Sequence, residues 1–139
     1  MNTHWIRPFF LVAGLYDAVL GLAFFFAHDS IFAFFEVTPA NHPAYVQFPA
    51  LLLVVFGAMF VHIASDPPRL RALIPYGMAL KVAYAGLAFW YQFTLGIPSM
   101  WLPWAWIDLG FLVGFAVAWT VLEPDRNSCP MDGTRNDCR

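Results

Sequence analysis

IPYGMALKVAYAGLAFWYQF, residues 74–93, is an apolar and aromatic stretch that carries one lysine, Lys81. A helix needs ~20 residues to cross ~30 Å of hydrocarbon, and this stretch has that length. A cation inside such a helix is costly unless it has a partner. The rest of the chain must therefore explain how Lys81 is accommodated.

The composition is that of a membrane protein. Of the 139 residues, 60 % are hydrophobic and only 12 % are charged, and the mean hydropathy is +0.63. Soluble domains carry ~25 % charged residues, and a core of this size cannot bury the apolar excess. Four apolar runs account for it, and each predicts one transmembrane helix: 6–27, 48–64, 73–95 and 102–122. The predicted fold is all-α, an integral membrane four-helix bundle spanning residues 1–123.

Basic residues lie at one end of the predicted bundle. Arg7 precedes the first helix, Arg69 and Arg71 lie between the second and third, and three further arginines follow the fourth. The loops at the opposite end, 28–46 and 96–101, contain no Lys or Arg. The positive-inside rule therefore predicts that both termini face the cytoplasm.

The loop after the first helix is unusually apolar. It contains Ile31, Phe32, Phe34 and Phe35 among polar residues. This pattern predicts a short amphipathic segment that lies along the outer membrane interface.

The C-terminal tail, residues 124–139, is polar and has no periodicity. We expect it to be disordered and cytoplasmic. Its cysteines, Cys129 and Cys138, are then expected to be free thiols, because the cytoplasm is reducing.

The charges within the apolar runs lie at similar depths. Asp17 follows Arg7 by ten residues and Lys81 follows Arg71 by ten, which places both about 15 Å from the inner boundary. Asp108 lies about one and a half helical turns farther from that boundary, within reach of a lysine side chain. The three charged groups can therefore meet near the middle of the membrane.

Energetics favour such a meeting. A central Lys or Asp costs roughly 2.5–3.5 kcal/mol on insertion scales, so unpaired charges facing lipid are hard to sustain. We therefore predict an intramembrane Asp17–Lys81–Asp108 polar cluster. Tyr84 lies on the same helix face as Lys81 and adds a phenol that can donate a hydrogen bond. The cluster either fixes the helix register or serves as a ligand-binding or proton-handling site.

The histidines offer two further candidates. His62 and Asp66 are one helical turn apart near the inner end, where they would form an end pair or pass protons. His28, Asp29 and His42 in the outer loop carry ligands suited to Zn²⁺ or Cu²⁺ but lack a recognised ligand spacing. A solvated polar loop is the favoured interpretation there, and no metal site is predicted.

Motifs of common enzyme and nucleotide-binding families are missing from the sequence. It contains no G-x-G-x-x-G, Walker A, H-E-x-x-H or G-x-S-x-G pattern. Nothing indicates nucleic-acid binding, and no cofactor can be assigned.

Two stretches carry a family resemblance: LIPYGMALKVAY (73–84), which contains Lys81, and MWLPWAWIDL (100–109), which contains Asp108. With four helices and a basic inner link, the layout resembles small bacterial inner-membrane proteins of the broad DoxX-like type. The resemblance implies a multi-pass protein of the bacterial inner membrane and an accessory role beside quinone-linked oxidoreductases. It assigns no functional residue.

Three functions remain open. The first is an accessory subunit, or a bundle that binds a small molecule, lipid or quinone at the polar cluster. The second is a transporter or proton-coupled permease, as an oligomer because four helices enclose little pore. The third is an enzyme acting on a lipid-phase substrate. The expected partners are the lipid bilayer and either a second copy of the chain or a larger membrane complex.

Overall fold

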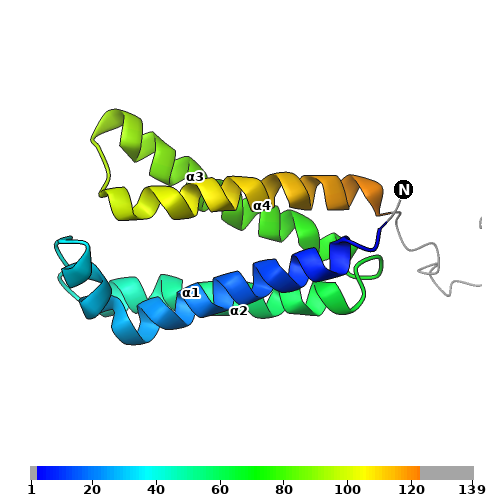
Figure 1. The fold of residues 1–139 in the computed structure, drawn as a ribbon, viewed down its shortest axis with the longest axis horizontal. Helices are drawn as coiled ribbons and strands as arrows, with labels where there is room; N and C mark the ends of the chain where they lie inside the picture. Colours follow the sequence, from blue (N-terminus) through cyan, green and yellow to red (C-terminus); the bar gives the residue numbers. More distant parts are fainter. Residues whose placement is uncertain (1–2, 123–139) are drawn as a thin grey trace, which may run out of the picture.

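The chain folds into two helical hairpins, shown by the computed structural model in Figure 1. The structure describes residues 3–122, so the predicted tail and its cysteines lie outside the described residues. In chain order the elements are α1 (Ile6–Phe34), α2 (Ala44–Ser65), η1 (Arg71–Leu73), α3 (Ile74–Thr94), η2 (Ser99–Trp101) and α4 (Leu102–Val121), where η marks one turn of 3₁₀ helix.

The predicted all-α architecture is confirmed. Four helices are long and apolar enough to cross a membrane, and no strand occurs within the described range. α1 pairs with α2 and α3 pairs with α4, while the two hairpins contact each other much less. Both hairpin loops lie at one end of the molecule, here called the loop end (Figure 1). The N-terminus and the α2–α3 connection lie at the opposite end, here called the terminal end.

α1 extends beyond the predicted range 6–27. At Ala27 the backbone leaves the helical region, with φ −127° and ψ 20°, and the helix then resumes as far as Phe34. The predicted end therefore coincides with a kink inside a longer helix. α2 likewise begins at Ala44, earlier than the predicted start at residue 48, and contains Pro49.

α1 ends in a Schellman motif. Glu36 takes a left-handed φ of 55°, its N–H bonds to the carbonyl of Ala33 at 3.3 Å, and the N–H of Val37 bonds to the carbonyl of Phe32 at 2.9 Å. Val37 and Phe32 also pack in one apolar cluster, which is the hydrophobic contact typical of this motif. The chain is thereby turned from α1 toward α2.

The predicted amphipathic segment forms the last part of α1. Phe32 is buried against Phe24, Ala50 and Met100, whereas Phe34 is exposed. The segment is therefore amphipathic. One side packs on the bundle through Phe32, and the other side, which carries Phe34, is exposed. The burial of Phe32 helps to hold the loop end of α1 against α2.

Glycines allow α1 and α2 to pack closely. A Cβ added to Gly14 would lie 2.7 Å from the carbonyl oxygen of Gly57, and a Cβ added to Gly57 would lie 2.7 Å from that of Gly14. Gly21 has the same relation to the carbonyl of Ala50, at 2.5 Å. Small residues that permit such approach drive helix association in membranes, where the hydrophobic effect between helices is absent.

Large aromatic side chains close the bundle at the terminal end. The rings of Phe10 and Phe115 stack with centroids 4.8 Å apart, and the Phe60 ring lies 4.8 Å from that of Phe115. These rings are buried together with Ile63 and Ile74, which brings all four helices into one apolar core.

Arg71 fastens the start of α3 to the end of α4. Its Nε donates to the carbonyl of Trp119 at 2.9 Å, and its guanidinium lies 4.4 Å from the centroid of the Trp119 ring. The cation therefore meets both an aromatic face and a carbonyl in the last turn of a helix, where positive charge is favoured.

We expect Gly57→Ala to lower the free energy of unfolding by about 1–3 kcal/mol, because the new methyl group would press on the backbone of α1. Gly86→Ala is the matched control, since a Cβ there meets no atom within 4 Å. Thermal melts of both variants in the same detergent provide the measurement. Equal melting temperatures would show that close α1–α2 contact does not stabilise the fold.

Candidate functional site: a buried ion cluster below an apolar cavity

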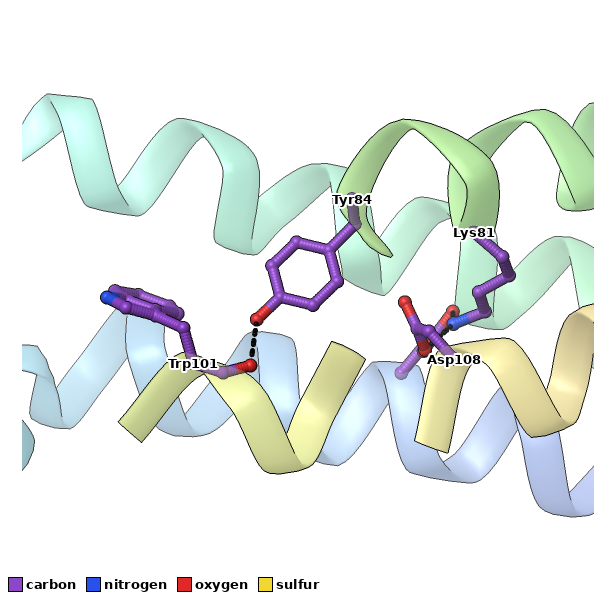
Figure 2. A network of polar contacts seen from close by, with 5 residues as sticks. Lys81, Tyr84, Trp101 and Asp108 are labelled. Carbon is purple, nitrogen blue, oxygen red and sulfur yellow. Dashed lines mark hydrogen bonds and ion pairs between the residues drawn. The ribbon is translucent and has the colours of Figure 1, made fainter. Parts of the chain in front are cut away.

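The predicted Asp17–Lys81–Asp108 cluster is present. Lys81 on α3 and Asp17 on α1 are 0 % exposed, and Asp108 on α4 is 5 % exposed. The Nζ atom of Lys81 donates to Asp17 Oδ1 at 2.7 Å, to Asp17 Oδ2 at 2.9 Å and to Asp108 Oδ1 at 2.8 Å. Figure 2 shows Lys81 reaching from its helix to Asp108 on the neighbouring one. The three charges from three helices therefore meet at one nitrogen.

The ammonium of Lys81 is enclosed by the two carboxylates and by aromatic rings. Its Nζ atom lies within hydrogen-bond distance of three carboxylate oxygens, two of which belong to the single carboxylate of Asp17. Aromatic rings surround it, with centroids 5.5 Å from Nζ for Tyr16, 5.8 Å for Phe60 and 5.5 Å for Phe111. These rings add cation–π attraction and exclude water. Lys81 is therefore the enclosed centre of the cluster, shut off from solvent.

The small residues near Lys81 make room for this arrangement. Gly77 precedes it by one turn on the same face, and a Cβ there would collide with the ring of Phe60. Ala85, one turn after Lys81, is buried against Ala105 of α4. A bulkier face on α3 would hold the other helices out of reach of the ammonium.

Tyr84 does not bond to the charged groups. Its hydroxyl donates to the carbonyl of Trp101 at 3.1 Å, as Figure 2 shows. This bond joins α3 to the beginning of α4 and leaves the lone pairs of the Tyr84 oxygen free to accept. Tyr84 belongs to the surroundings of the cluster rather than to its ion pairs.

Tyr16 is a site residue that sequence reasoning missed. Its hydroxyl oxygen is buried and has no hydrogen-bond partner among the described residues. A buried hydroxyl without a partner costs roughly 1–3 kcal/mol, so it calls for an explanation. In the sequence, the one indication that Tyr16 belongs to the site is its position next to Asp17. Adjacent residues point to different sides of a helix, however, and only the packing of α4 brings both toward one space.

That space is a cavity of about 560 Å³ between the two hairpins. Its polar lining includes Asp17, Asp108, Tyr16 and Tyr84, and Lys81 does not line it. Most of the other walls are apolar, and residues near the loop end also contribute, among them Val37, Thr38, Tyr45 and Pro98. The cavity therefore runs from the loop end to the two carboxylates.

A second hollow lies on the other side of Tyr16. It measures about 600 Å³ and is lined largely by exposed apolar side chains such as Val12, Leu15 and Val19, with no carboxylate. We interpret it as lipid-facing surface. Tyr16 and Trp104 line both hollows, with ring centroids 6.3 Å apart, so they form part of the wall between the lipid side and the cavity.

The predicted His62–Asp66 pair is not formed. Within residues 3–122, no hydrogen bond or ion pair joins the two side chains. The Asp66 carboxylate instead accepts from the backbone N–H of Arg69 at 3.5 Å, and the carbonyl of His62 accepts from Ser65 at 2.6 Å. The aromatic core at the terminal end also separates this region from the ion cluster.

The outer-loop candidates for metal binding do not gather at one point. His28 Nε2 lies 3.4 Å from Asp29 Oδ1, whereas the Nδ1 atom of His42 accepts from the backbone N–H of Ala44 at 3.1 Å. Among the described residues, no group of three or more His, Cys, Asp or Glu is arranged to hold a metal ion.

We expect Lys81→Met to lower the free energy of unfolding by about 3–5 kcal/mol, because it leaves two carboxylates without their cation. Adding Asp17→Asn should restore part of this loss, since one stranded charge is removed. Asp66→Asn, outside the cluster, serves as the control and should change stability by less than about 0.5 kcal/mol. Unfolding curves in one detergent measure all three. A double variant no more stable than Lys81→Met would contradict the pairing.

Comparison with protein-family models, curated proteins and solved structures found no match. The DoxX-like resemblance therefore stays a prediction from the sequence.

Proposed function

We propose that this protein binds a lipid-phase small molecule in the cavity between its hairpins, with the polar end of the ligand at Asp108 and Asp17. The observation that carries the proposal is a cavity of about 560 Å³ that ends on two carboxylates. Small-molecule sites typically measure roughly 300–1,000 Å³ and combine apolar walls with a few converging polar groups. This cavity has both properties.

The number of charges argues for a role beyond fixing helix register. One lysine and one aspartate suffice for a neutral pair, yet Lys81 meets both Asp17 and Asp108. A second buried carboxylate is costly in a membrane, and intramembrane ionisable residues are functional candidates by default. The extra carboxylate, Asp108, lines the cavity, and 7 % of its side chain is accessible.

The same geometry favours binding over transport, the alternative function. Between the cluster and the terminal end, Phe10, Phe60 and Phe115 fill the space between the helices. The cluster can therefore be reached from the loop end but not from the terminal end. A permeation path would require this aromatic core to separate.

The proposed location is the bacterial inner membrane, with both termini in the cytoplasm. Arg7, Arg69 and Arg71 lie at the terminal end, while residues 28–46 and 96–101 at the loop end contain no Lys or Arg. In this orientation the cavity opens toward the outer side of the membrane. The exposed apolar surface suits lipid and neighbouring membrane proteins alike, so an accessory role in a complex is compatible with the binding function.

Cysteine labelling tests the orientation, after Cys129 and Cys138 have been replaced by serine. A membrane-impermeant maleimide should label Thr38→Cys in intact cells but should label Ser65→Cys only after permeabilisation. Both positions are exposed. Thr38 lies in the loop before α2, at the loop end, and Ser65 is the last residue of α2, at the terminal end. The reverse labelling pattern would overturn the proposed orientation.

Filling the cavity tests the binding function. Leu53 lines the cavity, whereas Val55 on the same helix is 63 % exposed and does not. We expect native mass spectrometry of the protein from its own membranes, in mild detergent, to show a bound small molecule. Leu53→Trp should remove this added mass and Val55→Trp should retain it. A bare wild-type protein, or the same bound mass in both variants, would contradict the proposal.

A further inference from the structure

Resting on the proposed function, we infer that the ligand carries a cationic, hydrogen-bond-donating headgroup, such as a primary ammonium on an apolar chain. This inference specifies the chemistry of the ligand, which the proposed function leaves open. It follows from which atoms at the closed end of the cavity are still free to bond, and from their charge.

Two acceptors near the cluster are free to bond a ligand. Lys81 is 0 % exposed and does not line the cavity, and the hydroxyl hydrogen of Tyr84 is donated to the carbonyl of Trp101. Asp108 Oδ1 is held by Lys81, while its Oδ2 has no hydrogen bond within the described part of the chain. Asp108 Oδ2 and the Tyr84 oxygen can therefore accept hydrogen bonds from a ligand.

Tyr16 supplies a free donor beside Asp17. Its buried hydroxyl has no partner within residues 3–122, and its side chain lines the same cavity. A hydroxyl also accepts, so Tyr16 can serve a donating headgroup as well. A ligand whose head only accepts would satisfy Tyr16 but leave Asp108 Oδ2 without a partner.

The net charge of the ion cluster also favours a cationic headgroup. With Asp17, Asp108 and Lys81 each in its usual ionised form, the cluster carries two negative charges and one positive charge, a formal charge of −1. No Lys or Arg is among the cavity-lining residues, so a cation entering the cavity meets uncompensated negative charge. Coulomb interactions are strong in surroundings of low dielectric constant, and an anionic head would be repelled.

The test compares probes with similar tails and different heads. Dodecylammonium carries charge and N–H donors, and dodecyltrimethylammonium carries charge without a donor. Dodecanol carries an uncharged hydroxyl that donates and accepts, and 2-dodecanone carries only an acceptor. Binding of each is measured at pH 7 on the full chain in nanodiscs of zwitterionic lipid. The cavity-filled Leu53→Trp protein provides the background for partition into lipid.

We expect dodecylammonium to bind at least about tenfold more tightly than each of the other three probes, because it alone combines a positive charge with N–H donors that can bond to the Asp108 carboxylate. A tenfold difference in affinity corresponds to about 1.4 kcal/mol. Asp108→Asn should weaken dodecylammonium binding by at least about tenfold while leaving dodecanol within about threefold. Asp29→Asn is the control, because the Asp29 side chain is 84 % exposed and does not line the cavity.

The outcomes separate the inference from the proposed function. If all four probes bind wild type above the Leu53→Trp background with similar affinity, the headgroup inference is overturned and the binding function stands. If no probe exceeds that background, both are overturned. The wild-type probe series alone decides between these results, so the test does not depend on Asp108→Asn folding normally.

Discussion

The bonding of one ammonium to three carboxylate oxygens is the interaction on which this structure depends. Lys81 can stay in the middle of an apolar helix only because the carboxylates of Asp17 and Asp108 bond to its ammonium, at 2.7–2.9 Å. The two aspartates belong to different hairpins, which otherwise share few contacts. The ion cluster therefore holds the hairpins together at mid-bundle, where burial would otherwise make each charge prohibitively costly.

The cluster also marks a boundary within the bundle. Toward the terminal end, Phe10, Phe60 and Phe115 fill the interior, whereas toward the loop end the hairpins enclose a cavity of about 560 Å³. Asp17 and Asp108 thus have the ammonium on one side and the cavity on the other. This asymmetry places the ion cluster at the closed end of the cavity, where we propose that the ligand binds.

Sequence reasoning identified Asp17, Lys81 and Asp108 because charges stand out in apolar runs and a helix has a fixed rise per residue. It did not identify Tyr16, whose role depends on the packing of α4 against α1, or the hydrogen bond from Tyr84 to Trp101. The continuation of α1 past Ala27 was also missed. There the polar residues His28 and Asp29 resemble a loop, while the burial of Phe32 stabilises a helix.

The sequence by itself determined the helix count, the membrane class and the meeting of three charges, because hydrophobicity and helical rise are properties of each segment alone. Only the tertiary structure decided which oxygens hold Lys81, which oxygen of Asp108 is left free, and where the hairpins separate. These features depend on how each helix is rotated and how closely it packs. That in turn is set by contacts between distant residues, such as Gly14 with Gly57 and Phe10 with Phe115.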